Sequence, residues 1–189
     1  MKMSPVREDV TSATPRPALP AMRRYWSEAD LTKVGFSTAE AERIAPVLPS
    51  VTVRAFRHAM GHAWYLYDDS GPAAVVLYAT YRLPRDVARR LARSGCDLVE
   101  LVGIIDTFVE TLFEDGVVPY WPTSDTDVLL EWTEDQRIAS DRVVAYLRAG
   151  VDREEAAAFE ADETARPSTA QLDVLAALRC PALTGANRR

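Results

Sequence analysis

His58 and His62 are the only histidines of the chain, and they lie four residues apart. This spacing places two imidazoles on one face of a helix or of a strand. Such a pair could hold a metal ion, with Asp68 or Asp69 as a carboxylate ligand. The sequence offers no HExxH glutamate between them, no third histidine and no paired cysteine. We therefore expect no bound metal, and a metal-dependent enzyme built on this pair is the third of three functional hypotheses.

A basic cluster surrounds one predicted helix and consists of Arg82, Arg85, Arg89, Arg90 and Arg93. Arg85, Arg89 and Arg93 share a face through their i, i+4 spacing. That face could clamp a phosphate or bind an acidic partner. The segments that follow are rich in carboxylates, so ion pairs within the chain are the favoured interpretation. Arg85, Arg89 and Arg93 are candidate partner-binding residues under the alternative.

Two aromatic residues, Tyr120 and Trp121, stand between prolines in a polar stretch after Gly116. The simplest interpretation is a buried lid over the core. Under the alternative, Tyr120 and Trp121 are exposed and contact a partner, because aromatic side chains often dominate binding surfaces.

No catalytic motif is present in the sequence. There is no GxSxG elbow, no P-loop and no GxGxxG. Cys96 and Cys180 stand outside any CxxC pattern and are interpreted as small apolar residues. Close aspartates, such as Asp125 and Asp127, are common in loops. We therefore expect no cofactor, and an enzyme is the less favoured class.

Three predicted helix joints share one pattern: a leucine, then glycine, an apolar residue, a capping residue and a glutamate three positions later. They span residues 31–40, 91–100 and 147–155. Glycine can adopt the left-handed backbone that ends a helix, and the serine or aspartate then opens the next helix with a capping box. The joints resemble the turn of a helix-turn-helix unit. The helices that follow carry many carboxylates, which would face DNA phosphates, so a DNA-associated regulator is the second hypothesis.

These caps, together with apolar periodicity, predict seven helices near residues 28–34, 38–48, 85–93, 98–113, 134–148, 153–161 and 169–178. Between residues 51 and 81 the pattern predicts a three-stranded antiparallel β-meander, whose last strand is 74–78. The alternative there is one helix over residues 53–67. A stretch at 127–132 could add a fourth strand. The expected fold is α+β, predominantly helical, with this small sheet in the middle third.

The composition fits one globular domain, with 48% hydrophobic residues among 189. Proline-rich residues 1–24 are expected to form a disordered tail, residues 25–180 one mostly helical domain, and residues 181–189 a flexible end. The chain shows neither a signal peptide nor a membrane-spanning run, so a soluble, cytoplasmic protein is expected. Abundant arginine and alanine with scarce asparagine is typical of a GC-rich bacterial genome.

A formal net charge of −6 disfavours nucleic acid and anionic lipid as partners. By exclusion, the leading hypothesis is a non-catalytic regulatory or protein-interaction protein whose partner is another protein. The sequence does not predict its oligomeric state.

Overall fold

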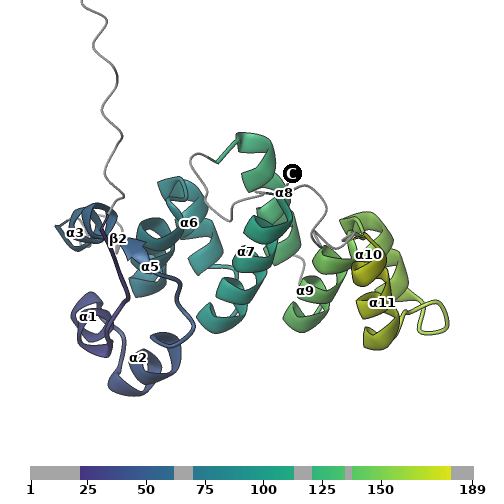
Figure 1. The fold of residues 1–189 in the computed structure, drawn as a ribbon, viewed down its shortest axis with the longest axis horizontal. Helices are drawn as coiled ribbons and strands as arrows, with labels where there is room; N and C mark the ends of the chain where they lie inside the picture. The colour runs from purple at the N-terminus through teal and green to yellow at the C-terminus, as the bar shows by residue number, and fades with distance from the viewer. Residues whose placement is uncertain (1–21, 62–69, 113–120, 135–137, 180–189) are drawn as a thin grey trace, which may run out of the picture.

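Helices dominate the computed structural model, which describes residues 22–61, 70–112, 121–134 and 138–179 (Figure 1). The helices are α1 Glu28–Val34, α2 Thr38–Ile44, α3 Val53–Gly61, α5 Gly71–Tyr81, α6 Arg85–Ala92, α7 Leu98–Leu112, α8 Thr123–Glu134, α9 Ser140–Ala149, α10 Arg153–Ala161 and α11 Thr169–Arg179. Two short strands, β1 Arg23–Arg24 and β2 Val51–Thr52, form an antiparallel sheet. The predicted α+β class, predominantly helical with a small antiparallel sheet, is confirmed.

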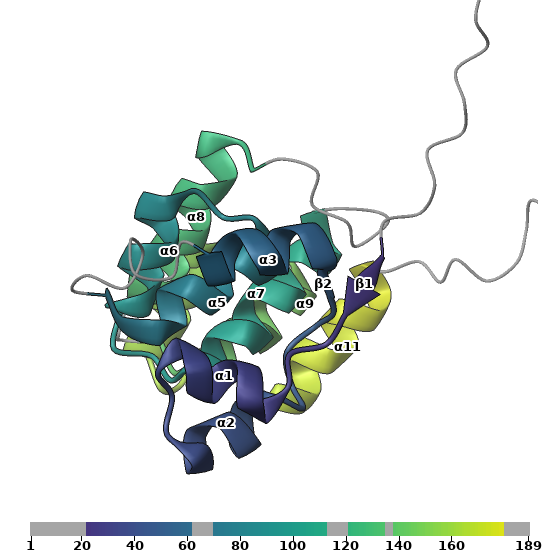
Figure 2. The ribbon, with the colours of Figure 1, turned by 90° about the vertical axis from the view of Figure 1, so that its left-hand side faces the viewer.

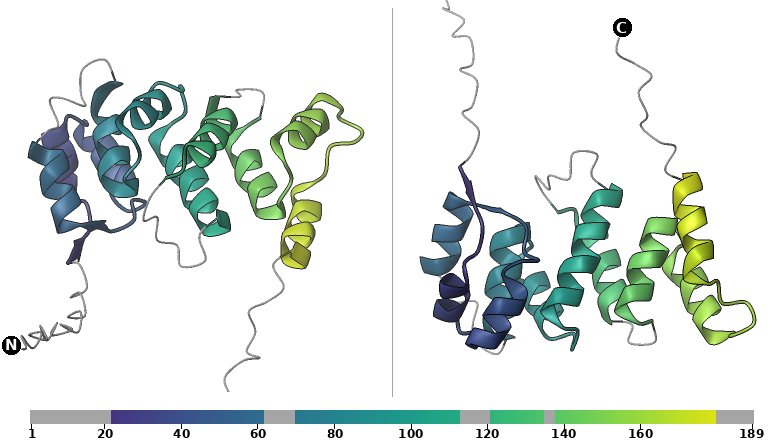
Figure 3. Two further views of the ribbon diagram at one scale, coloured as in Figure 1. Left: turned by 90° about the horizontal axis from the view of Figure 1, so that it is seen from above. Right: turned by 60° about the horizontal axis from the view of Figure 1, so that its bottom comes forward.

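The helices form a row that runs from α1, α2 and α3 at one end, through α5, α6, α7 and α8, to α9, α10 and α11 at the other (Figures 1 and 3). Helix α3 packs on α5, α5 on α6 and α6 on α8, while α7 packs on α9 and α9 on α11. Seen along the long axis, α1 and α3 lie in front and α9 and α11 lie behind (Figure 2). The β-sheet and α11 therefore mark opposite ends of the row.

The small sheet differs from the predicted meander in its position. Arg23 pairs with Thr52 and Arg24 with Val51, so two residues that we placed in the N-terminal tail form one of its strands. Residues 53–61 form helix α3, as the alternative interpretation had it, and the predicted strands 74–78 and 127–132 lie within α5 and α8. Residues 64–67 of the meander lie outside the described part, as does the rest of the tail up to residue 21.

The burial of α5 explains why its sequence pattern predicted a strand instead of a helix. Ala74, Val75, Val76 and Leu77 are all completely buried. A helix that is covered on every side needs no polar face, so its sequence loses the 3.6-residue periodicity and becomes indistinguishable from a buried strand. Pro72 lies in the first turn, where its missing N–H costs no helical hydrogen bond.

The predicted helix joints form, with one variation. Ser37 and Glu40 close a capping box at the start of α2, and Asp152 accepts the Glu155 N–H at 2.8 Å at the start of α10. At the middle joint Asp97 accepts the Val99 N–H at 2.8 Å. Its expected partner Glu100 instead accepts a hydrogen bond of 2.9 Å from the Ser140 hydroxyl, which ties α7 to α9. These local signals placed most of the helices correctly.

One hydrophobic core runs along the row, from Trp26 at one end to Leu172 at the other. Helix α7 contributes Leu98, Leu101, Ile105 and Phe108 to this core, whereas Leu112 in its last turn is exposed. At the N-terminal end the Trp26 indole N–H donates to the Thr80 hydroxyl at 3.0 Å, which fixes the chain before α1 against α5. Among the described residues, no helix combines the length and apolarity needed to cross a bilayer.

Candidate functional site

The candidate arginines lie along α6. Arg85 and Arg93 are exposed, and Arg89 is half-buried. Arg90, a member of the same cluster, donates two hydrogen bonds of 3.0 and 2.9 Å to the Glu134 carboxylate of α8. This pairing raises the pKa of Arg90. One arginine of the cluster therefore forms an ion pair within the chain, as the favoured interpretation predicted. Partner binding by Arg85, Arg89 and Arg93 stays a prediction.

Trp121 is buried, with 3% of its surface exposed. Its indole N–H donates to the carbonyl of Tyr81 at 2.7 Å, which satisfies an otherwise open carbonyl at the end of α5. Its ring stacks on Phe108 with the ring centroids 6.3 Å apart. Trp121 is therefore buried over the core, as the simplest interpretation predicted. The alternative prediction, that its side chain is exposed, is wrong. Tyr120 lies outside the described residues.

The histidine pair is described only in part. His58 is exposed on α3, with its ring centroid 6.1 Å from that of Tyr78, whereas His62 lies outside the described residues. Across the described ranges, no group of three or more His, Cys, Asp or Glu residues is placed to hold a metal ion.

The first of the three helix joints, which leads into α2, carries charges that do not suit binding to DNA phosphates. Arg43 on α2 donates two hydrogen bonds, of 2.8 and 2.6 Å, to the carboxylate of Asp97. Glu40 and Glu42 on the same short helix are exposed. The cation of α2 is therefore paired with the start of α7, while its carboxylates face solvent.

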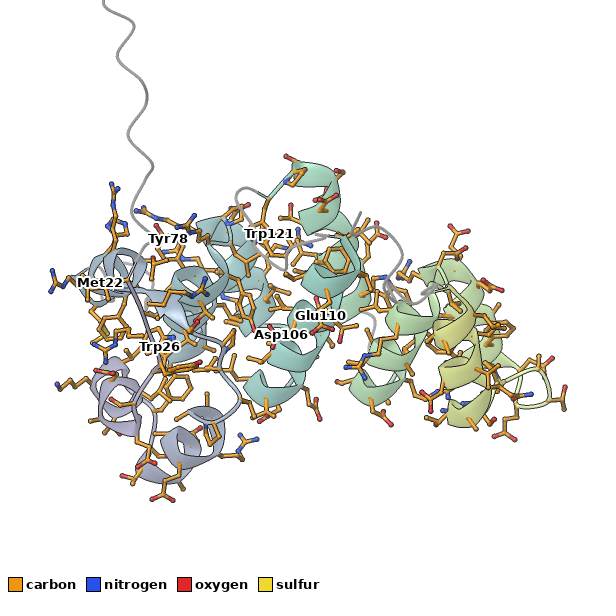
Figure 4. The ribbon with its side chains drawn as sticks, in the orientation of Figure 1. Met22, Trp26, Tyr78, Asp106, Glu110 and Trp121 are labelled. Carbon is orange, nitrogen blue, oxygen red and sulfur yellow. The ribbon has the colours of Figure 1, made fainter. Side chains whose placement is uncertain are left out.

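A half-buried carboxylate on α7 was not recognised from the sequence. Asp106 accepts a hydrogen bond of 2.8 Å from the buried Tyr81 hydroxyl. Burial raises the pKa of Asp106, and the charge of Glu110, one turn further on, adds to that rise. Burial also raises the pKa of Tyr81. Figure 4 shows Asp106 and Glu110 close together on α7.

An apolar groove lies at the far end of the row, beside α11. Its volume is about 690 Å³. It is lined by Thr164, Ala165, Arg166, Pro167, Ala170, Gln171, Val174 and Leu175. Three large aliphatic side chains of α11 are exposed: Val174 at 59% and Leu175 at 37%, which line the groove, and Leu178 at 74%, one turn beyond Val174. The inner side of α11 is anchored by Leu172, which is buried, and packs on α9.

A buried polar network holds one wall of this groove. Arg142 on α9 donates to Glu160 of α10 at 2.9 Å, to the Tyr146 hydroxyl at 2.7 Å and to the Pro167 carbonyl at 2.9 Å. Arg166 reaches the second oxygen of Glu160 at 2.8 Å. Because Arg166 and Pro167 line the groove, this network positions a wall that would otherwise be an ordinary surface loop.

The chain was compared with protein-family models, with curated proteins and with solved structures, and none of the three comparisons gives a match.

Proposed function

We propose that the protein is a non-catalytic interaction module that binds an amphipathic helix of another protein in the groove beside α11. The observation that carries this proposal is the joint exposure of Val174, Leu175 and Leu178 on one short helix. Single exposed aliphatic residues are normal on soluble proteins, but a contiguous apolar patch beside a groove is typical of an interaction surface.

A helix is the occupant that fits this surface. Val174 and Leu178 are one turn apart, and Ala170 lies one turn before Val174, so these side chains form a ridge along α11. A partner helix with apolar residues at i, i+4 and i+7 can pack against such a ridge. It would extend the row beyond α11 in the way that α11 itself packs on α9.

The charges around the groove favour an apolar contact. Among the described residues that line the groove, Arg166 is the only charged one, and it is paired with Glu160. A partner therefore needs no carboxylate or cation at the centre of its binding face, and its charges belong at the rim.

A second copy of the chain is the less suitable occupant. The eleven residues of α11 give a helix about 16 Å long. One face of so short a helix cannot supply the roughly 800 Å² per partner that a stable interface needs. We therefore propose a short-lived complex with a helix of another protein.

A binding titration with the full chain tests the proposal. The probe is a fluorescent model peptide that forms an amphipathic helix, with leucines on one face and alternating glutamate and lysine elsewhere. We expect saturable binding, and a loss of about tenfold or more in affinity for Val174→Asp, because an apolar anchor is replaced by a charge. Val128→Asp is the matched control, since Val128 is similarly exposed on α8, far from the groove.

Two outcomes would contradict this proposal. Absence of saturable binding, or an equal loss in the Val128→Asp control, would remove the role of the groove. A stable dimer of the free chain in sedimentation experiments that is abolished by Val174→Asp would show that a second copy occupies it.

A further inference from the structure

A second pocket lies at the opposite end of the row, between the first turns of α3 and the end of α5. Its volume is about 360 Å³. It is lined by Thr52, Arg54, Ala55, His58 and Arg82. Arg54 and His58 are one turn apart on α3, so both lie on the face of that helix that borders the pocket.

The pocket is cationic in a protein of net charge −6. Two arginines and a histidine line it, and among the described residues that line it there is no carboxylate. Neither α3 nor α5 contains an aspartate or glutamate within its bounds. In the part of the chain that the structure describes, neither Arg54 nor Arg82 forms an ion pair with a carboxylate. Arg43 and Arg90, by contrast, are paired with carboxylates within the chain.

Arg82 has a backbone conformation that its side chain does not favour. Its φ is 57° and its ψ is 27°, and it is the one non-glycine residue with positive φ in the described ranges. The turn requires this left-handed conformation, because the Arg82 N–H donates to the Tyr78 carbonyl and ends α5. Glycine would adopt it without strain. A strained residue at the edge of a pocket points to a role for its side chain.

We propose that this pocket binds the phosphate monoester group of a small ligand, with the guanidinium groups of Arg54 and Arg82 as the principal contacts. Guanidinium forks form strong charge-assisted hydrogen bonds to phosphate oxygens. The two arginines come from different elements and can approach the phosphate from two sides. A dianionic phosphate has three terminal oxygens, so it can accept hydrogen bonds from both guanidinium groups and from the imidazole of His58. A carboxylate offers only two oxygens and one charge.

Thr52 provides one further donor. Its hydroxyl oxygen accepts the Ala55 N–H at 3.2 Å and so caps α3. The hydroxyl hydrogen can still donate to a ligand oxygen. The volume of the pocket lies at the lower end of the range for small-molecule sites, which favours a small phosphorylated compound over a macromolecule. This site is independent of the groove beside α11.

The test is calorimetric titration of the full chain with phenyl phosphate, inorganic phosphate and a dinucleotide phosphodiester. We expect saturable binding of phenyl phosphate and of inorganic phosphate, which can both carry two negative charges, and much weaker binding of the diester, which carries a single charge. Saturation by inorganic phosphate alone would show a site for the free anion and overturn a ligand with an attached group. Equal affinity for the diester would point to a nucleic-acid backbone and overturn the monoester assignment.

Arg82→Gly separates a binding role from a structural one. We expect this variant to unfold at a higher denaturant concentration, because the strain at φ 57° is relieved, and to bind phenyl phosphate at least about tenfold more weakly. Arg57→Gln is the control, since Arg57 is exposed on α3 and does not line the pocket. Unchanged affinity in Arg82→Gly, or an equal loss in Arg57→Gln, would overturn the proposal.

Discussion

Arg142 and Glu160 form an ion pair of 2.9 Å in which both side chains are about nine-tenths buried. The pair joins α9 to α10, and the Tyr146 hydroxyl also donates to Glu160 at 2.7 Å. Burial by itself would raise the pKa of Glu160, but the hydrogen bonds from Tyr146 and Arg142 outweigh it and hold this pKa below its ordinary value. The hydrogen bonds from Tyr146 and Arg142 therefore favour the ionised form of this carboxylate.

Replacing Glu160 by glutamine should destabilise the protein strongly. The guanidinium of Arg142 would stay buried without a counter-charge, which typically costs about 3–5 kcal/mol. Urea denaturation measures this loss, with Glu155→Gln on the exposed side of α10 as the control. A loss no greater than that of the control would mean that the pair is replaceable and does not hold the groove wall.

The Asp106 carboxyl should make stability depend on pH. Because burial raises the pKa of Asp106 above its ordinary value of 3.8, the folded state holds a proton that the unfolded chain has released. The free energy of unfolding should therefore fall as pH rises from about 4 through the raised pKa. Asp106→Asn cannot titrate, so its stability relative to the native chain should increase over that range. A difference that stays constant with pH would contradict this assignment.

Asp97 has two roles that mutations can separate. As the cap of α7 it accepts the Val99 N–H, and as an ion-pair partner it binds Arg43. Asp97→Ala should cost about 0.5–2 kcal/mol, because the cap is lost. Arg43→Ala should cost less, because the ion pair is largely exposed to solvent. Chemical denaturation of both variants measures this difference. Because Asp97→Ala removes the ion pair together with the cap, equal losses in the two variants would contradict a stabilising role of the cap.

Trp121→Phe should destabilise the fold although the ring stays apolar. The hydrogen bond to the Tyr81 carbonyl would be lost and a buried acceptor left without a donor, which costs about 1–3 kcal/mol. Thermal unfolding measures the effect. If the Tm is unchanged, water reaches this carbonyl and the indole does not close the end of α5.

Local signals in the sequence predicted the helix ends well. The capping residues before α1, α2 and α10 each bond within three residues, so their information is contained in a short window. The start of α9 was misplaced, because α8 continues through Glu134 and α9 begins at Ser140. No glycine or proline marks that boundary in the sequence.

The candidate sites required tertiary information that the sequence does not contain. Nothing in the sequence distinguishes Asp106 from the other carboxylates of α7, and only the packing of α5 brings the Tyr81 hydroxyl to within 2.8 Å of it. The phosphate pocket joins Arg54 and Arg82, which are separated by a whole helix and a segment outside the described ranges. The sequence pattern instead indicated the arginine cluster on α6 as a binding site, although Arg90 of that cluster is paired with Glu134.

The serial order of the helices also has a consequence for how the molecule opens. Because α11 packs on α9 and ends the row, its amide hydrogens should exchange with solvent through local fraying, without unfolding of α7. Helices that contact mainly the next helix or the next but one along the sequence also need little loop closure, which favours rapid folding. A ligand bound at α11 would suppress the fraying of this last helix, so occupancy at one end of the molecule could be followed by hydrogen exchange at single amides.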